Sequence, residues 1–391
     1  MKKIIKKAAR KFGLTREIAD IPYYWVPYRF LLGFAFPPQR VDMELTYLCN
    51  LRCQMCPLEN WKRQNQIKDT GTQLDVYGAG QKELTTSQII KIIDDLSKMG
   101  VKKVSLTGGE PFLRKDIMEI IKYVKERGVY CSITNNGSLI TRDIAEQLIK
   151  AEVDMLVFSI DGPEEVHNEI RGWDRSFAKI CEGIANINEQ KNKYSRKYPK
   201  IWANCVISAL NQNYLSQMVD VAVKLDIHFL DFLYVFFTDE EQVSKTNQLV
   251  AVGHLKPESQ ILSDNITKVD TEILRRQIKE CKEKARQNNI NVTFNPALEK
   301  NDELEKYFTN HSYAYVSKCF YPWYSSRIDP FGNVYPCSID TLMGNVNELA
   351  FSKIWNSTKY RNFRKILKRE KLFPKCAKCC VLTNKIWDYL P

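Results

Sequence analysis

The sequence is poor in histidine and in long apolar stretches, and its N-terminus does not resemble a secretory leader. Only four of its 391 residues are histidine, and the first is His167. The stretch MKKIIKKAARKF at the N-terminus is charged throughout, whereas a secretory signal needs an apolar region of about 7–15 residues. The most apolar run, Tyr23–Phe36, contains Pro27 and Arg29 and is shorter than the roughly 20 residues that span a membrane. We therefore expect neither secretion nor a transmembrane helix.

Cysteine is too sparse for a disulfide scaffold, because the chain has twelve cysteines in 391 residues. A reducing cytosol is the expected compartment, and there clustered cysteines bind metal more often than they pair. Eight of the twelve fall into two clusters: Cys49, Cys53 and Cys56, and then Cys319, Cys337, Cys376, Cys379 and Cys380. We expect the scattered remainder to be buried small side chains: Cys131, Cys181, Cys205 and Cys281.

Basic residues outnumber acidic ones, which gives a formal net charge of +12. Such an excess favours anionic partners, such as phosphorylated substrates, nucleic acid or an acidic membrane surface, although simple solubility also accounts for it. The first twelve residues are predicted to form a helix with one apolar face and lysines around the rest. Two interpretations of residues 1–36 stay open: contact with an anionic membrane surface, or an aromatic segment that covers one end of the main domain.

From residue 42 onward, β-rich runs alternate with helical patterns. The predicted strands are Asp42–Thr46, Lys103–Leu106, Val129–Thr134, Val153–Ser159, Ile201–Ser208 and Phe229–Phe236. The predicted helices are Thr86–Met99, Lys115–Glu126, Thr141–Ala151, Ser176–Gln190, Tyr214–Leu225 and Thr271–Gln287. Six such units predict an α/β fold with a parallel sheet, either open or curled into part of a barrel. Polar insertions at residues 57–83 and 238–270 are expected to be long loops.

Polar or glycine-rich stretches follow four successive predicted strands. They are ELTYLCNLRCQMCP, SLTGGEP, TNNG and SIDGP. Because the carboxyl ends of parallel strands meet at one edge, we expect these stretches to converge there. Gly108 and Gly109 permit close approach of the backbone to a ligand, and Glu110 adds a carboxylate beside them.

The first of these stretches holds three cysteines in the spacing Cys-x3-Cys-x2-Cys. A structural zinc site needs a fourth cysteine or histidine close by, and this segment has none. A cubane iron–sulfur cluster suits the loop better, because three cysteines bind three irons and leave the fourth open to a small molecule.

Cys49, Cys53 and Cys56, together with the GGEP of Gly108–Pro111, resemble the signature motifs of the radical S-adenosylmethionine (radical SAM) superfamily. The resemblance implies a partial (β/α)6 TIM barrel with a [4Fe–4S] cluster, whose open iron binds S-adenosylmethionine. It also implies that Gly108, Gly109 and Glu110 hold the amino group of that cofactor, and that Asn135, Ser159 and Asp161 lie near its carboxylate or ribose. Met55 stands where the family usually has an aromatic residue near the adenine, and methionine is an adaptable apolar substitute.

The C-terminal cysteines are similar to those of the SPASM and shorter twitch extensions of this superfamily, which bind auxiliary [4Fe–4S] clusters. The spacing Cys319-x17-Cys337, followed by Cys376-x2-Cys379, looks most like a twitch domain and implies one auxiliary cluster, with Cys380 spare or an alternative ligand. A zinc ribbon is the alternative for this segment. The expected domains are therefore residues 1–41, 42–313 and 314–391.

The resemblance implies an oxidoreductase that cleaves S-adenosylmethionine to a 5′-deoxyadenosyl radical and takes hydrogen from a substrate carbon. An auxiliary cluster held by four cysteines favours electron transfer, and hence a net oxidation of a polar, possibly anionic small molecule such as a sugar, nucleotide sugar or lipid headgroup. The spacing is similar to that of a twitch-bearing dehydrogenase of aminoglycoside biosynthesis. A reductant such as flavodoxin or ferredoxin is the expected partner, and the expected location is the cytoplasm, with peripheral membrane contact through residues 1–36 left open.

Three alternatives stay open at this stage. Peptide maturation uses the same chemistry, but the 41 residues before the first strand are too few for a peptide-recognition domain of roughly 80 residues. An epimerase would use a cysteine such as Cys205 to return hydrogen. A zinc- and nucleic-acid-binding protein is disfavoured by the GGE motif beside the three cysteines. The acid–base residue is unassigned, although His167, Arg171 and Asp174 follow the fourth strand.

Overall fold

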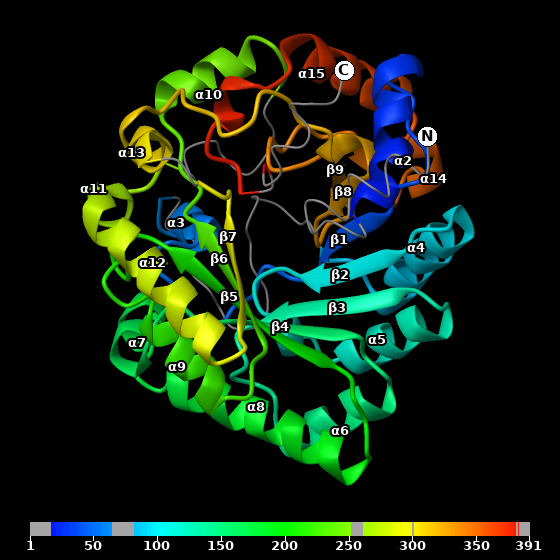
Figure 1. Cartoon of the computed structure of the whole chain (residues 1–391). Coiled ribbons are helices and arrows are strands. Elements are labelled where there is room, and N and C mark those ends of the chain that lie inside the picture. The colour runs from blue at the N-terminus through cyan, green and yellow to red at the C-terminus, as the bar shows by residue number, and fades with distance from the viewer. Residues whose placement is uncertain (1–16, 65–81, 252–260, 299–300, 381, 383–391) are drawn as a thin grey trace.

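The computed structural model describes the whole chain except residues 1–16, 65–81, 252–260, 299–300, 381 and 383–391 (Figure 1). The helix predicted for the first twelve residues therefore lies outside the described residues. Within them, no helix combines the length and apolar character needed to cross a bilayer.

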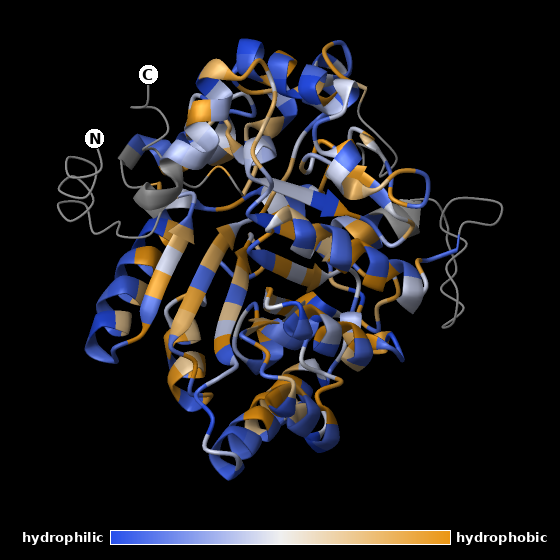
Figure 2. Ribbon diagram, turned by 90° about the vertical axis from the view of Figure 1, so that its right-hand side faces the viewer, coloured by the Kyte–Doolittle hydropathy of each residue, from blue (hydrophilic) through white to orange (hydrophobic). Residues whose placement is uncertain are grey.

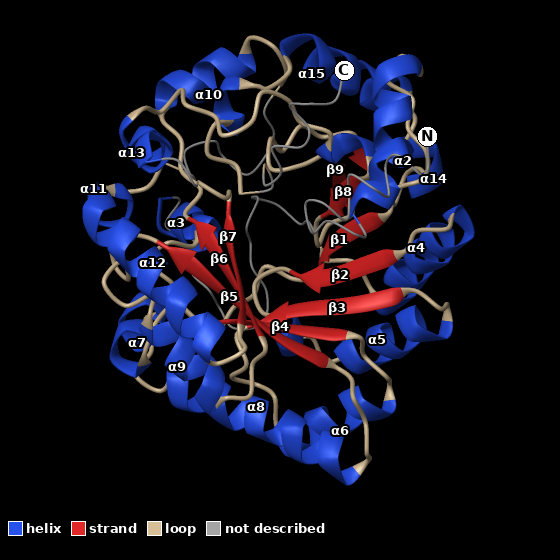
Figure 3. Cartoon of the chain, viewed as in Figure 1, coloured by secondary structure: helices blue, strands red, loops and turns tan. Residues whose placement is uncertain are grey.

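One mixed sheet forms the centre of the molecule (Figure 3). Its order is β10-β9-β8-β1-β2-β3-β4-β5-β6-β7, and the strands from β8 to β7 run parallel, whereas β9 and β10 add antiparallel pairs. The strands are β1 Arg40–Glu44, β2 Lys103–Thr107, β3 Tyr130–Asn135, β4 Met155–Ser159, β5 Lys200–Ile207, β6 Phe229–Tyr234, β7 Asn291–Asn295, β8 Ser325–Ile328, β9 Asn333–Tyr335 and β10 Gly344–Asn345. The sheet curls without closing, so the expected partial barrel is confirmed.

Helices pack around the outside of this sheet (Figure 1). They are α2 Glu17–Phe30, α3 Pro57–Gln64, α4 Thr86–Met99, α5 Ile117–Glu126, α6 Arg142–Lys150, α7 Glu164–Arg171, α8 Ser176–Lys193, α9 Gln217–Lys224, α10 Glu240–Asn247, α11 Asp264–Thr267, α12 Thr271–Gln287, α13 Asn301–Thr309, α14 Phe351–Ile354 and α15 Thr358–Glu370. Orange bands lie on both the strands and the helices, and the helices also carry many blue turns (Figure 2). This pattern places the hydrophobic core between sheet and helices.

Helix α4 illustrates how local sequence fixes an element. Its apolar residues recur at helical spacing and are all buried: Ile89, Ile92, Ile93 and Leu96. Thr85 and Gln88 form a capping box at the start, and Gly100 ends the helix in a left-handed conformation (φ +81°). The observed bounds of α4 are those predicted from the sequence.

The structure adds elements that the sequence pattern did not predict. A seventh parallel strand, β7, follows α12, and the short helix α7 follows β4. The two segments expected to be long loops contain helices: α3 in the first, and α10 and α11 in the second. These helices have 4 to 8 residues, which is too short for a clear helical period.

The C-terminal segment is part of the same sheet, because β8 pairs in parallel with β1 from Arg40–Ser325 to Met43–Ile328. Helix α2 lies against this segment: Tyr28 contacts Phe320 and Trp323 with ring centroids 4.4 and 4.9 Å apart. The inner aromatic residues of the N-terminal segment thus pack against the C-terminal segment, and covering of one end of the main domain stays a prediction.

Candidate active site

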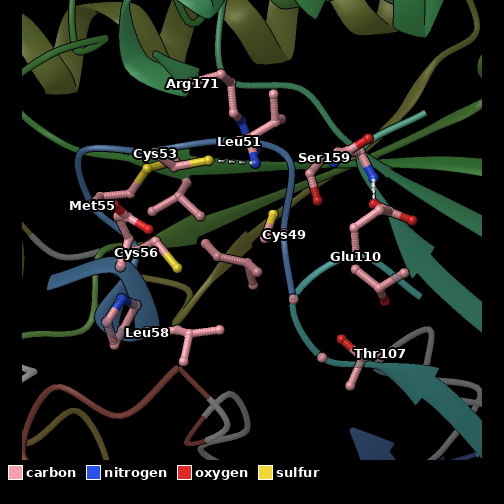
Figure 4. A pocket seen from close by; sticks show the side chains of 18 of the residues that line it. Cys49, Leu51, Cys53, Met55, Cys56, Leu58, Thr107, Glu110, Ser159 and Arg171 are labelled. Atoms are coloured by element: carbon pink, nitrogen blue, oxygen red, sulfur yellow. Dashed lines mark hydrogen bonds between the residues drawn. The ribbon is translucent and has the colours of Figure 1, made fainter. Parts of the chain in front are cut away.

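The loops at the carboxyl ends of β1 to β6 surround a cavity of about 310 Å³ (Figure 4). Its wall includes all three cysteines of the first cluster, the GGE motif, and residues after β3, β4 and β6. The four stretches singled out in the sequence therefore lie at one edge of the sheet, although only Ser159 of SIDGP lines the cavity.

The three-cysteine loop is held by the end of α7. The backbone N–H groups of Arg52 and Gln54 donate to the carbonyls of Arg171 and Ile170, at 3.2 and 2.9 Å. Arg171 also reaches into the cavity wall, where its Nη1 lies 3.6 Å from the sulfur of Cys53 (Figure 4). Burial raises the pKa of the Cys53 thiol, and the Arg171 guanidinium opposes that shift. The loop is therefore positioned before any cofactor binds.

No three cysteine, histidine or acidic side chains among the described residues converge closely enough to hold a single metal ion. A cubane cluster makes a different demand, since each cysteine binds a separate iron. The three cysteines on one cavity wall fit that demand better than they fit a mononuclear site.

Gly108 and Gly109 bring the β2 loop against the cysteine loop. A Cβ at Gly108 would lie 2.3 Å from the Thr46 carbonyl oxygen, and one at Gly109 would lie 2.1 Å from that of Leu48. The backbone N–H groups of Gly109 and Glu110 donate to the same two carbonyls at 2.7 Å. The sequence suggested that the glycines allow close approach to a ligand. In the structure, the close approach is between these two loops.

Glu110 is buried beside the cavity, with its carboxylate held by two backbone N–H groups. Phe112 donates to Oε1 at 3.1 Å, and Asn136 donates to Oε2 at 2.8 Å. Burial raises the pKa of Glu110 to about 7. Each oxygen keeps a further lone pair that can accept a hydrogen bond. A buried carboxylate with this spare capacity fits the amino group of S-adenosylmethionine.

Asn135, Ser159 and Met55 line the cavity as well. The Asn135 carboxamide is engaged locally, because its oxygen accepts from the Gly137 N–H at 2.8 Å and its nitrogen donates to the Val157 carbonyl at 3.3 Å. Ser159 and Met55 point toward the same cavity (Figure 4), and their contact with the cofactor stays a prediction.

Asp161 is placed differently from the sequence expectation, since it does not line the cavity. Its carboxylate is fully buried and pairs with Arg171, Oδ2 to Nη2 at 2.5 Å, while Oδ1 accepts from the Val206 N–H at 2.8 Å. Burial raises the pKa of Asp161, and Arg171 opposes the shift. The pair holds Arg171 against Cys53, so Asp161 acts on the cysteine loop through Arg171.

The other residues considered after β4 differ in position. His167 is buried, and its Nδ1 accepts from the Asp161 N–H at 3.2 Å; burial lowers the pKa of His167 well below its usual value. Asp174 is exposed and, like His167, is absent from the cavity wall. Only Arg171 of the three lines the cavity.

The C-terminal cysteines come from three places: before β8, just after β9, and after α15. Burial raises the pKa values of Cys319 and Cys337, and the neighbouring Cys376 raises both further. These three side chains thus lie within electrostatic reach of one another. Cys379 is also buried, three residues after Cys376, which ends the turn Pro374–Cys376.

Two residues of the cavity wall were missed or left without a role by sequence reasoning. Cys380 follows Cys379 directly but lines the cavity that holds the first cysteine cluster. Tyr234, at the end of β6, also lines the cavity, and its buried hydroxyl has no hydrogen-bond partner among the described residues. Cys205, the thiol suggested for an epimerase, is fully buried against Asn211 and does not line the cavity.

Comparison with known proteins places these features in a family. Residues 43–197 match the radical SAM superfamily, and residues 319–380 match SPASM, an iron–sulfur cluster-binding domain. An AdoMet-dependent heme synthase of Methanosarcina barkeri is 27% identical, over 89% of this chain and 90% of its own length. A probable GTP 3′,8-cyclase of Pyrococcus abyssi is 30% identical, over 54% of this chain and 67% of its own.

Further matches agree. The PqqA peptide cyclase of Bradyrhizobium diazoefficiens is 28% identical, over 50% of this chain and 46% of its own. The structure of Streptococcus suis SuiB bound to its precursor peptide SuiA shares the fold, with a TM-score of 0.59 and 16% identity over 90% of this chain and 74% of that one. These findings imply a [4Fe–4S] cluster with S-adenosylmethionine in the barrel and auxiliary iron–sulfur ligation near the C-terminus. The chain is an enzyme of the radical SAM superfamily with a C-terminal SPASM domain.

Proposed function

We propose that this enzyme takes a hydrogen atom from a carbon of a substrate bound beside Tyr234 and Cys380, in a net oxidation. When bound at Cys49, Cys53 and Cys56, the cluster and S-adenosylmethionine supply the 5′-deoxyadenosyl radical for that step. Cys319, Cys337, Cys376 and Cys379 would hold an auxiliary cluster able to accept one electron from the substrate, while a proton leaves to a base. An external one-electron reductant such as flavodoxin or ferredoxin is required as well.

One observation carries this proposal: Cys380 lines the cavity of the first cysteine cluster and is the immediate neighbour of Cys379. The wall of the cavity is thus continuous in sequence with the second cysteine cluster. A substrate in the cavity would contact the loop that carries the proposed auxiliary ligands, which gives an electron a short route out of the cavity.

The remaining wall of the cavity is apolar and would shield a radical intermediate from water. Apolar side chains from the cysteine loop, α3, β5 and β6 supply much of its surface: Leu51, Leu58, Val206, Leu233, Val235 and Phe236. Such a lining excludes water and offers few polar groups that compete for the substrate. Glu110 and Arg171 are the charged side chains best placed to orient the polar parts of the cofactor.

Tyr234 is the group that we propose binds substrate. Its hydroxyl is buried without a described partner, which is costly unless a ligand completes the hydrogen bond. Burial raises the pKa of Tyr234, so the hydroxyl stays neutral and can donate. The substrate should therefore present an acceptor such as a carbonyl or hydroxyl oxygen.

For the substrate class, a peptide is the second candidate beside a polar small molecule. The relatives support the peptide better, because one is a PqqA peptide cyclase and the SuiB structure is described with a bound precursor peptide. A backbone carbonyl also supplies the acceptor that Tyr234 requires. In the small-molecule alternative, a sugar hydroxyl would take that place.

Anaerobic reconstitution followed by a single turnover tests the oxidation. We expect about eight irons and about eight sulfides per chain, and equal amounts of 5′-deoxyadenosine and of a substrate two electrons more oxidised. Formation of 5′-deoxyadenosine together with a redox-neutral product would contradict the net oxidation.

The substrate class is tested by the rate at which 5′-deoxyadenosine forms. Short peptides encoded beside the gene are compared with sugars and nucleotide sugars, and the Tyr234→Phe variant is the control for specific binding. Stimulation by a peptide that is lost in Tyr234→Phe supports the peptide candidate. Stimulation by sugars alone would reject it.

A further inference from the structure

Three large apolar side chains project into solvent from the end of α2 and the turn that follows it. Phe30, Leu32 and Phe34 are 61%, 76% and 43% exposed. Of the seven large hydrophobic residues exposed in the described part of the chain, three thus fall within five residues. We call this surface, formed by Phe30, Leu32 and Phe34, the apolar turn. Exposed apolar residues are ordinary when scattered, but a cluster signals an interaction surface.

The backbone of the apolar turn is fixed from within. Arg364 of α15 is fully buried and donates to the Gly33 carbonyl at 3.1 Å. Ala35 forms two hydrogen bonds with the Asn356 side chain, at 3.0 and 2.9 Å. Leu32 adopts a left-handed conformation (φ +47°) that costs a non-glycine residue free energy. The protein therefore presents these side chains outward from an anchored segment.

Basic side chains of α15 adjoin the apolar turn. A Cβ at Gly33 would lie 2.4 Å from the Arg361 carbonyl oxygen and 3.2 Å from Lys365 Cγ, so the turn touches α15 at these two residues. Arg361, Lys365 and Arg369 are exposed and spaced four residues apart, which puts them on one face of the helix. Helices α2 and α15 also lie side by side in Figure 1. We call Arg361, Lys365 and Arg369 the basic face.

The charge of the preceding sequence has the same sign. Residues 1–16 contain seven lysines and arginines and no aspartate or glutamate. Arg369 pairs with Glu370 at 2.6 Å, whereas Arg361 and Lys365 form no ion pair with a described carboxylate. A partner for this surface must therefore be both apolar and anionic. A second copy of the chain meets only the first condition, because its own basic face would repel the first.

We propose that the apolar turn and the basic face together dock the enzyme on an anionic phospholipid surface. The three apolar side chains would enter the boundary between headgroups and acyl chains, while the basic face contacts the phosphates. Clustered basic residues beside exposed aromatic and aliphatic side chains are the features that bind peripheral proteins to such membranes. This inference is independent of the proposed reaction.

Co-sedimentation of the full-length protein with vesicles tests the proposal, using phosphatidylcholine alone and phosphatidylcholine mixed with phosphatidylglycerol. We expect binding to the mixed vesicles that weakens as salt increases. In the double variant Leu32→Asn/Phe34→Ser, the partition coefficient should fall about tenfold. The control Val223→Ser/Leu349→Ser removes two apolar side chains elsewhere that are 50% and 47% exposed, and it should bind like the natural protein.

A second pair of variants separates charge from apolar contact. Arg361→Gln/Lys365→Gln should lose most of the preference for phosphatidylglycerol, whereas Lys282→Gln/Arg286→Gln, an exposed pair with the same spacing on α12, should keep it. Circular dichroism and thermal unfolding establish that each variant is folded. Equal vesicle binding by both pairs would overturn the proposal, as would a dimer detected by light scattering that Leu32→Asn/Phe34→Ser dissociates.

Discussion

The two cysteine clusters are assembled in different ways. Cys49, Cys53 and Cys56 lie on one loop of eight residues, and they form one wall of a cavity. Cys319, Cys337, Cys376 and Cys379 come from segments up to 60 residues apart, and long-range sheet pairing between β1 and β8 helps to bring their domain into place. The first cluster faces a ligand space, whereas the side chains of the second are largely enclosed by protein.

This difference determines how much of the protein must be folded to form each site. The first loop is hydrogen-bonded to the β2 loop, to the loop after β3 and to α7. The second site requires most of the C-terminal segment to be folded. Accordingly, we expect substitution of a cysteine in the first cluster to abolish cleavage of S-adenosylmethionine without unfolding the protein. Substitution of a cysteine in the second cluster should lower both product formation and stability.

The largest effect is expected for Cys53→Ala. Loss of one of three ligands should prevent assembly of the first cluster, so reductive cleavage of S-adenosylmethionine should fall at least about a thousandfold. Iron should fall from about eight to about four atoms per chain. Anaerobic iron analysis and 5′-deoxyadenosine assays measure both, with Cys181→Ala as the control because that thiol lies outside both clusters. Normal cleavage by Cys53→Ala would exclude this loop as the cofactor site.

The next largest effect is expected for the double variant Cys376→Ala/Cys379→Ala. It should lose about four irons and form oxidised product about a hundredfold more slowly, while still cleaving S-adenosylmethionine. The Cys281→Ala variant, which removes a buried thiol outside both clusters, controls for lost packing. If product forms at the normal rate in the double variant, the C-terminal cysteines take no part in the oxidation.

A third prediction concerns the ion pair behind the first cluster. Asp161→Asn leaves the Arg171 guanidinium buried without its carboxylate, which should lower the free energy of unfolding by about 3–5 kcal/mol. Urea denaturation measures this change, and Asp174→Asn is the control because Asp174 is exposed. The same free energy of unfolding in both variants would mean that the pair does not stabilise the loop.

Much of the barrel could be predicted, because its elements have clear local periods. The helices Thr86–Met99 and Thr271–Gln287 were predicted at their observed bounds, and all six predicted strands are present within a few residues. The pairing of β8 with β1 produces no local sequence pattern, because it joins short strands that lie about 280 residues apart. Sequence reasoning therefore treated the C-terminal segment as a separate unit.

Some contacts of the candidate site could not be predicted, because they depend on short or unpredicted elements. SIDG was interpreted as contacting the cofactor, but the partner of Asp161 is Arg171 at the end of α7, a helix of only 8 residues that was not predicted. Cys379 and Cys380 are adjacent, so the sequence alone does not distinguish a cluster ligand from a cavity residue. The structure shows that Cys380 lines the cavity.

A moderate effect is expected for Gly109→Ala. Its Cβ would overlap the Leu48 carbonyl oxygen, so the β2 loop should move away from the cysteine loop, at a cost of about 1–3 kcal/mol. The affinity for S-adenosylmethionine, measured by equilibrium dialysis, should fall about tenfold. Gly100→Ala is the control, because that position has open space around it and only its left-handed φ is penalised. Equal affinity in the two variants would argue against a role for the loop contact.

The smallest effect is expected for Cys380→Ala. This variant tests whether Cys380 belongs to the second cluster as a ligand or to the cavity wall. Iron should stay at about eight atoms per chain, because Cys379 is the proposed ligand. Oxidised product should form several-fold more slowly, since the cavity wall loses a side chain that faces the substrate. Iron analysis combined with product assays distinguishes the roles, and a loss of about four irons would make Cys380 itself a ligand.

The pairing of β1 with β8 also has a consequence for synthesis on the ribosome. At about 5–20 residues per second, β8 emerges tens of seconds after β1. During that interval the outer edge of β1 lacks its native neighbour and offers unpaired backbone groups to other chains. A nascent chain that stalls before residue 325 would keep this edge open, so truncated products of this protein should aggregate more readily than the complete chain.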